Sequence, residues 1–218
     1  MNKFQRIFFD MDGTLHPIRQ ESFIVSPVHD QMVKRSIVYL MQRLRIGKRK
    51  ATELLEGIMT RYPRFYSLGL QKEHGIDRWD YLDYSWNIDP DGIIHRVDGL
   101  DKMLNDLTKR NELYVVSDAP RVWVGNVTGY LGIRNLFSGL YSGTNLNLKK
   151  KQGLFPYILS DIKVKPSQCY MVGDEEQNDI IPAKEAGIKT VFIGGTDSAV
   201  ADYSIRDILS LRRIIVDD

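Results

Sequence analysis

The chain has 218 residues, which is enough for one substantial hydrophobic core and a second, small helical unit. Lys and Arg together number 30 and Asp and Glu 28, so the net charge is +2 and gives no support to a nucleic-acid-binding protein, which needs a clustered basic face. The single cysteine, Cys169, excludes an internal disulfide, and no apolar run reaches the ~20 residues that span a bilayer. The first residues also lack the apolar stretch of a signal peptide, and we therefore expect a cytoplasmic protein.

The first predicted strand, residues 7–9, is followed by a long segment in which the apolar pattern is helical. Ser26 and Pro27 form a favourable helix start, with Ser at the cap and Pro at the first helical position. Apolar stripes predict four helices, at 27–44, 51–59, 64–72 and 78–86. We therefore predict a helical insert that packs as a cap over an α/β core. The predicted domains are the core, residues 1–15 and 96–218, and the cap, residues 16–95.

The rest of the chain alternates between helical and strand patterns. Three short, nearly continuous apolar runs predict further strands at 113–116, 169–172 and 190–194. Amphipathic spacing predicts helices at 100–107, 122–131, 154–159 and 180–186. Strands that alternate with helices form βαβ units, so the predicted fold class is α/β, with a Rossmann-like, doubly wound parallel sheet.

Four groups of polar residues follow predicted strands, where open α/β sheets place their ligands. They are Asp10-Met11-Asp12-Gly13-Thr14, Ser117-Asp118, Lys149-Lys150-Lys151 and Asp174 to Asp179. Each alone has an ordinary structural explanation, as a turn, a strand end, a solvated loop or a helix cap. Together, and in this order, the acidic, hydroxyl, cationic and acidic groups supply the parts for transferring a phosphoryl group.

On these motifs the chain resembles the haloacid dehalogenase-like (HAD) hydrolase superfamily, in its helical-cap (C1) phosphatase branch, over essentially its whole length. The Asp-x-Asp-Gly-Thr motif that begins at Asp10 is the most specific one. The later motifs of the family correspond to Ser117, the triplet Lys149 to Lys151, and Asp174 with Asp179. Lys149 fits the lysine motif best because Phe155 follows it at a spacing of six residues, and Lys150 and Lys151 remain as alternatives.

The resemblance implies a magnesium-dependent phosphatase that works through an aspartyl-phosphate intermediate. Asp10 would be the nucleophile, and Asp12 would protonate the leaving oxygen and then activate water. Lys149 would neutralise Asp10 and the phosphate. The implied Mg²⁺ ligands are Asp10, the main-chain carbonyl of Asp12, Asp174 and Asp179. The implied substrate-binding residues are Thr14, Ser117 and Asp118.

Some positions depart from the family pattern or carry a weaker prediction. Asp12 argues against the dehalogenase branch, which does not keep this second aspartate. Asp118 stands where Asn is usual, and Lys150 stands where Pro usually follows the motif lysine. The aromatic residues of the insert are predicted to form its core rather than to stack a base. For His16 we expect a surface position, with a place lining the cleft between cap and core as the alternative.

The substrate is left open by the sequence. Residues 62–81 look similar to pyrimidine 5′-nucleotidase-like members, which implies a nucleoside 5′-monophosphate, and phosphoglycolate or a sugar phosphate are equally compatible with the motifs. We expect a small phosphorylated metabolite as the partner, no nucleic-acid polymer and no membrane, and a monomer or homodimer. The alternatives are a phosphomutase and a catalytically silent protein that binds a phosphorylated ligand or a protein partner.

Overall fold

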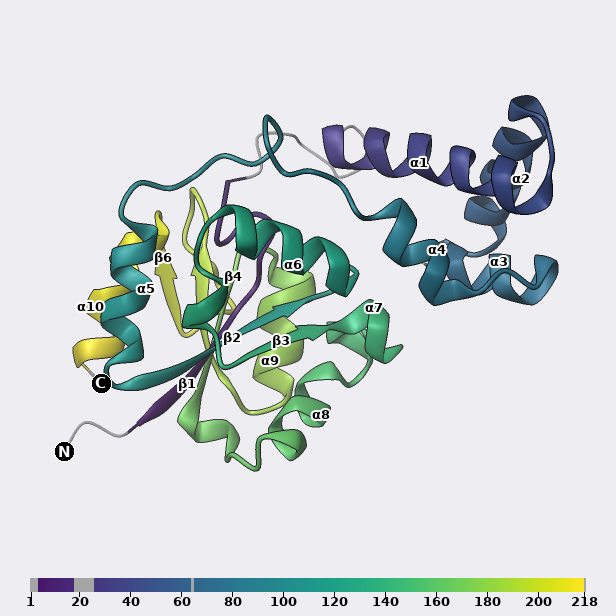
Figure 1. Ribbon diagram of the computed structural model, residues 1–218. Helices are drawn as coiled ribbons and strands as arrows, with labels where there is room; N and C mark the ends of the chain where they lie inside the picture. Colours follow the sequence, from purple (N-terminus) through teal and green to yellow (C-terminus); the bar gives the residue numbers. More distant parts are fainter. Residues whose placement is uncertain (1–3, 18–25, 64, 218) are drawn as a thin grey trace. The chain divides into compact units, whose positions relative to one another are not determined.

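The computed structural model describes residues 4–17, 26–63 and 65–217 (Figure 1). The chain divides into two compact units, one made of Met1–Ile18 with Ile94–Asp218 and the other of Arg19–Ile93. We call them the core unit and the helical unit. Within the described residues, no helix is both long and apolar enough to cross a membrane. The packing of the helical unit as a cap over the core unit stays a prediction.

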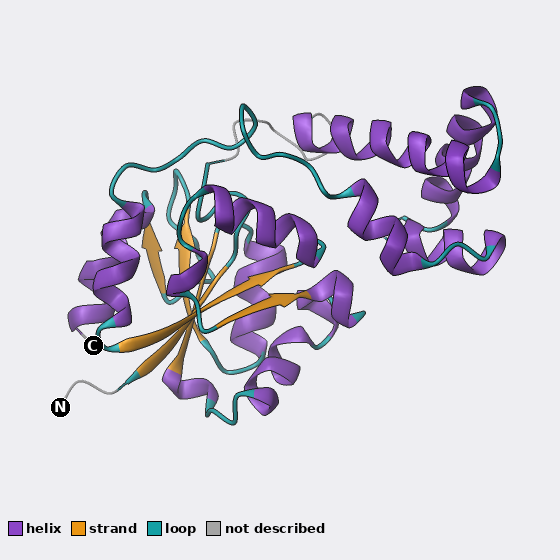
Figure 2. Ribbon diagram, viewed as in Figure 1, coloured by secondary structure: helices purple, strands orange, loops and turns teal. Residues whose placement is uncertain are grey.

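The core unit is built on a parallel sheet whose described strands follow the order β3-β2-β1-β4-β5-β6 (Figures 1 and 2). The strands are β1 Gln5–Phe9, β2 Asn111–Ser117, β3 Gly139–Ser142, β4 Cys169–Gly173, β5 Lys189–Ile193 and β6 Tyr203–Ile205. Every neighbouring pair is parallel, which confirms the predicted α/β class. The sequence did not predict β3 and β6, because these edge strands are short, largely half-buried and without a long apolar run.

Helices cover both faces of this sheet (Figure 2). They are α5 Leu100–Thr108, α6 Arg121–Tyr130, α7 Gly143–Leu146, α8 Leu154–Asp161, α9 Ile181–Glu185 and α10 Leu211–Asp217. Successive side chains of a strand point to opposite faces. Phe8 accordingly packs in a buried cluster with Phe155 of α8 and Ala183 of α9, whereas the ring of Phe9 meets that of Phe137 at 6.0 Å.

The register of β1 brings three strand ends to one edge of the sheet. β1 lies between β2 and β4, and Phe9 is aligned with Val115 on one side and with Val172 on the other. Because all three strands run in the same direction, the residues that follow them emerge close together. Asp10 follows β1 directly and Asp174 follows β4 directly, so the sheet itself places these two carboxylates side by side.

The helical unit contains the four predicted helices. They are α1 Pro27–Leu44, α2 Lys48–Arg61, α3 Tyr66–His74 and α4 Arg78–Ser85. Ser26 caps α1 as predicted, because its side chain accepts the N–H of His29 at 3.1 Å and Pro27 is the first helical residue. The close approach of α3 to Tyr62 requires a glycine, since a Cβ at Gly69 would lie 2.4 Å from the Tyr62 ring.

Aromatic side chains form much of the interior of the helical unit. Tyr81 is fully buried and its ring meets those of Tyr39 and Tyr66 edge-on. The indole N–H of Trp86 donates to the hydroxyl of Tyr66 at 2.9 Å, which satisfies the polar end of a buried aromatic side chain. These residues therefore serve as core, as predicted, whereas Trp79 is 39% exposed.

Replacement of Phe155 by Ala should destabilise the core unit by about 3–5 kcal/mol, because it removes a fully buried ring between α8 and the sheet. Tyr157→Ala is the matched control: it lies on the same helix, its side chain is 40% exposed, and its loss should cost about 1 kcal/mol or less. Urea unfolding followed by fluorescence measures both. Equal losses in the two variants would contradict the packing described for α8.

Candidate active site

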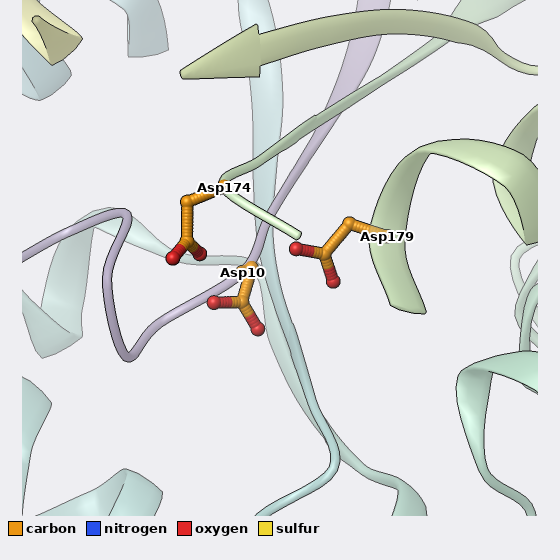
Figure 3. Close-up of side chains that lie close together, drawn as sticks. All are labelled: Asp10, Asp174 and Asp179. Atoms are coloured by element: carbon orange, nitrogen blue, oxygen red, sulfur yellow. The ribbon is translucent and has the colours of Figure 1, made fainter. Parts of the chain in front are cut away.

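Three carboxylates from separate segments meet at the edge of the sheet where β1 and β4 end. Oxygens of Asp10, Asp174 and Asp179 all lie within 4.8 Å of one another (Figure 3). Asp10 is 7% exposed and Asp179 only 1%. Burying several negative charges together is costly unless cations compensate them. The cluster therefore needs positive charge from elsewhere.

Asp179 reaches the cluster through an unusual helical turn. Residues Glu176–Ile180 form one π-helical turn ahead of α9, a distortion that is frequent at functional sites. Oδ2 of Asp179 accepts the N–H of Glu175 at 3.0 Å, which fixes the carboxylate. The preceding strand ends in Gly173, and a Cβ there would lie 2.4 Å from the same oxygen. Glycine at the end of β4 thus makes room for Asp179.

Lys150 supplies a buried positive charge to this cluster. Its ammonium group donates to Oδ1 of Asp10 and to Oδ1 of Asp179, and the residue is 4% exposed. The prediction that Lys149 occupies this position is therefore wrong. Lys149 has an extended backbone just before the 3-10 turn Lys150–Gln152, and its Nζ donates instead to the carbonyl of Asp118 at 2.8 Å. Three adjacent lysines give the same sequence pattern, so the turn geometry, not the spacing, decides which one is buried.

Charge and burial perturb the pKa values of the cluster. Burial raises the pKa of Asp10 well above its usual range, and Lys150 opposes this effect. Burial, followed by the charges of Asp179 and Glu175, raises the pKa of Asp174 to about 7. Burial lowers the pKa of Lys150, but the charges of Asp10 and Asp179 outweigh it and hold that pKa above its usual value. The lysine therefore stays protonated, and the excess negative charge leaves a site that could hold a hard cation.

The turn after β1 packs against Asp174. The hydroxyl of Thr14 donates to Oδ1 of Asp174 at 3.2 Å, and Thr14 itself is 4% exposed. Gly13 has a φ of +94°, which favours glycine, and a Cβ there would lie 2.1 Å from Oδ2 of Asp174. Thr14, predicted as a substrate-binding residue, is thus placed where it orients Asp174.

Asp12 is not a member of the three-carboxylate cluster. Its Oδ1 accepts the indole N–H of Trp123 at 3.2 Å and lies 3.0 Å from Nε2 of His16. His16 is only 3% exposed, so the expected surface position is wrong. Trp123 is not among the residues predicted from the sequence, because it lies 111 positions from Asp12 and looks like an ordinary apolar residue at the start of a helix.

Ser117 and Asp118 follow β2 at the same edge. Ser117 is 2% exposed and its Oγ accepts the N–H of Ala119 at 3.1 Å. Oδ1 of Asp118 accepts the N–H of Lys150 at 3.1 Å. The carbonyl of Asp118 accepts the hydroxyl of Thr144 at 2.7 Å, in addition to the ammonium of Lys149. Asp118, predicted as a substrate-binding residue, therefore holds the loop that carries Lys150.

Comparison with known proteins identifies the family of the chain. Residues 7–193 match the haloacid dehalogenase-like hydrolase family, and the chain belongs to that family. A phosphoglycolate phosphatase from Colwellia psychrerythraea is 35% identical over 80 residues, which cover 36% of this chain and 35% of that protein. A D-glycero-beta-D-manno-heptose-1,7-bisphosphate 7-phosphatase from Haemophilus ducreyi is 38% identical over 52 residues, or 24% of this chain and 28% of that protein. The chain thus spans about a third of the length of these curated relatives.

Solved structures show the same fold over nearly the whole chain. A HAD phosphatase from Thermococcus onnurineus superposes with a TM-score of 0.66 at 22% identity, covering 97% of this chain and 98% of that one. A 2-haloacid dehalogenase from Pseudomonas syringae pv. Tomato superposes with a TM-score of 0.65 at 16% identity, covering 98% and 99%. Because phosphatases and dehalogenases share this fold, the fold alone does not decide between the two reactions.

Replacement of Lys150 by Met should destabilise the protein by about 3–5 kcal/mol at alkaline pH, because it leaves Asp10 and Asp179 buried without their shared cation. The loss should be smaller at acid pH, where protonation removes the uncompensated charges. Urea unfolding at both pH values measures this difference. Lys151→Met, at an exposed position of the same triplet, should have little effect at either pH. A loss that is independent of pH would contradict the ion pairs described for Lys150.

Proposed function

We propose that this protein is a Mg²⁺-dependent phosphatase that hydrolyses a small phosphomonoester through an aspartyl-phosphate on Asp10. The observation that carries the proposal is the buried cluster in which Lys150 bridges Asp10 and Asp179 beside Asp174. A carboxylate nucleophile must be ionised, and Lys150 favours that form against the effect of burial. The presence of Asp12 favours a phosphatase over a dehalogenase, since the dehalogenase branch of the family does not keep this aspartate.

The donor set of the cluster fits Mg²⁺. All three side chains offer oxygen, which this hard cation prefers, and they converge within 4.8 Å while leaving other positions for water. Asp10, Asp174, Asp179 and the main-chain carbonyl of Asp12 would hold the ion. The ion would lower the repulsion between the anionic nucleophile and the anionic phosphate.

Each step of the proposed reaction uses a residue of the core unit. A carboxylate oxygen of Asp10 bonds to phosphorus while the bond from phosphorus to the ester oxygen breaks, and Asp12 gives that oxygen a proton. Asp12 then takes a proton from water, whose oxygen bonds to phosphorus and releases Asp10. Lys150 balances charge on Asp10 and the phosphoryl group, and Ser117 donates to a phosphate oxygen.

The relatives indicate a class of substrate and not an individual compound. The two curated relatives are named as phosphatases of phosphoglycolate and of a heptose bisphosphate, so small phosphomonoesters of these kinds are the first candidates. A nucleoside 5′-monophosphate is a further candidate. A phosphomutase or a catalytically silent binding protein would release no free phosphate, so phosphate release from a panel of these esters distinguishes the alternatives.

Asp10→Asn should reduce phosphate release to background while the fold persists, because the amide is a far weaker nucleophile than the carboxylate. Asp197→Asn, at an exposed position of the core unit, is the matched control and should keep full activity. Phosphate release is measured with magnesium and with EDTA, and acid-quenched wild type is searched by mass spectrometry for a phosphoryl group on Asp10. Turnover by the Asp10→Asn variant, or phosphate release that persists in EDTA, would rule out the proposed mechanism.

Magnesium should bind more tightly as the pH rises through about 7, because Asp174 must lose its proton to become a ligand. Without metal, the stability of the folded state changes with pH in the opposite direction. The pKa of Asp174 in the folded state lies above the ordinary value of 3.8, so ionisation of Asp174 between about pH 4 and 7 destabilises the folded state. The rise in melting temperature on adding Mg²⁺, measured at about pH 6 and at about pH 8, should therefore be larger at the higher pH. Asp174→Asn should remove most of this pH dependence, and an unchanged dependence in that variant would assign it to another group.

A further inference from the structure

We propose that His16 and Trp123 are positioning residues that hold one carboxylate oxygen of Asp12, so that the other oxygen carries the proton in both steps of the reaction. The inference rests on the proposed function, in which Asp12 is the acid and then the base. Both contacts converge on Oδ1, at 3.0 Å from His16 and 3.2 Å from Trp123. Within the described part of the chain, no hydrogen bond of the structure reaches Oδ2 of Asp12.

The chemistry of the two partners decides which oxygen is free. An indole N–H can only donate, so Oδ1 must accept from Trp123 and is unfavourable as the site of the acidic proton. In His16, Nδ1 is buried and meets no hydrogen-bond partner among the described residues, whereas Nε2 faces Oδ1. The tautomer with its proton on Nε2 satisfies Asp12 and gives Oδ1 a second donor. The proton that is exchanged with the substrate then belongs on Oδ2.

The two donors are themselves fixed by the fold. His16 is 3% exposed and pairs with Asp12 in a short bridge, in which the N–H of Gly13 donates to the carbonyl of His16 at 3.0 Å. Trp123 is 1% exposed and comes from the first turn of α6, after β2. The side chain of Asp12, in contrast, is 31% exposed. Two rigid buried groups therefore orient a carboxylate that would otherwise rotate freely about its last torsion.

A misplaced Asp12 should slow the two steps unequally, and this gives the test. With p-nitrophenyl phosphate the leaving group departs without needing a proton, so Asp10 is still phosphorylated. Release of the phosphoryl group still needs Asp12 as the base. Trp123→Phe and His16→Leu should therefore lower kcat by about 10–100-fold and raise the fraction of enzyme trapped as the aspartyl-phosphate in acid-quenched turnover. Asp12→Asn should show the same behaviour more strongly.

A conservative variant, a control variant at the surface and a test of folding separate a positioning role from damage to the fold. His16→Gln can place an amide N–H near Oδ1 and should recover part of the activity that His16→Leu loses. His95→Gln, at an exposed position, should behave as wild type. A variant whose melting temperature still rises with Mg²⁺ has kept its fold and its cation site, and only such variants are compared.

The outcomes distinguish this inference from the proposed function. If wild type releases phosphate and forms the phosphoenzyme, but folded Trp123→Phe and His16→Leu keep wild-type kcat or lose it without accumulating phosphoenzyme, the positioning role is wrong. If wild type itself forms no phosphoenzyme and releases no phosphate from any ester of the panel, the proposed function fails, and the inference fails with it.

Discussion

The rest of the site depends on the two ion pairs that the buried ammonium group of Lys150 forms with Asp10 and Asp179. A buried lysine is stable only with anionic partners, and buried carboxylates are stable only with cations, so each side of the contact requires the other. The balance is nevertheless incomplete, because Asp174 adds a third carboxylate within the same 4.8 Å. The remaining negative charge is what makes the cluster suitable for a divalent cation. Burial, followed by the charges of Asp179 and Glu175, raises the pKa of Asp174 to about 7 without one.

The fold supplies this cluster through the geometry of a parallel sheet. Because β1 is central and in register with β2 and β4, Asp10 and Asp174 emerge from adjacent strand ends. The groups that come from outside the sheet need further support. A π-helical turn brings in Asp179, and hydrogen bonds from the loop to Asp118 bring in Lys150. Irregular local structure thus occurs where regular helices and strands alone would not bring a charged side chain to the cluster.

The sequence predicted the features that depend on local pattern. The four helices of the helical unit, the buried strands of the sheet and the carboxylates that follow β1 and β4 all have such a pattern, in apolar periodicity or in the Asp-x-Asp-Gly-Thr motif. Lys150 was not distinguished from Lys149, because only the 3-10 turn separates their directions. His16 was wrongly predicted to lie at the surface, and Trp123 was not predicted as a partner of Asp12. A hydrogen bond between residues 111 positions apart produces no repeating pattern in the sequence. The role of the helical unit as a cap, and the catalytic roles themselves, stay predictions.

Every group assigned to the proposed chemistry belongs to the core unit, including the residues that orient Asp12. In the proposed chemistry the nucleophile Asp10 follows a strand of the sheet directly, whereas its charge partner Lys150 comes from a 3-10 turn outside the sheet. In the proposed mechanism Asp12 has to reach a leaving group and a water molecule, which agrees with its partly exposed carboxyl, and such a carboxyl needs an external constraint to keep one orientation. A buried indole and a buried imidazole on a single oxygen provide that constraint.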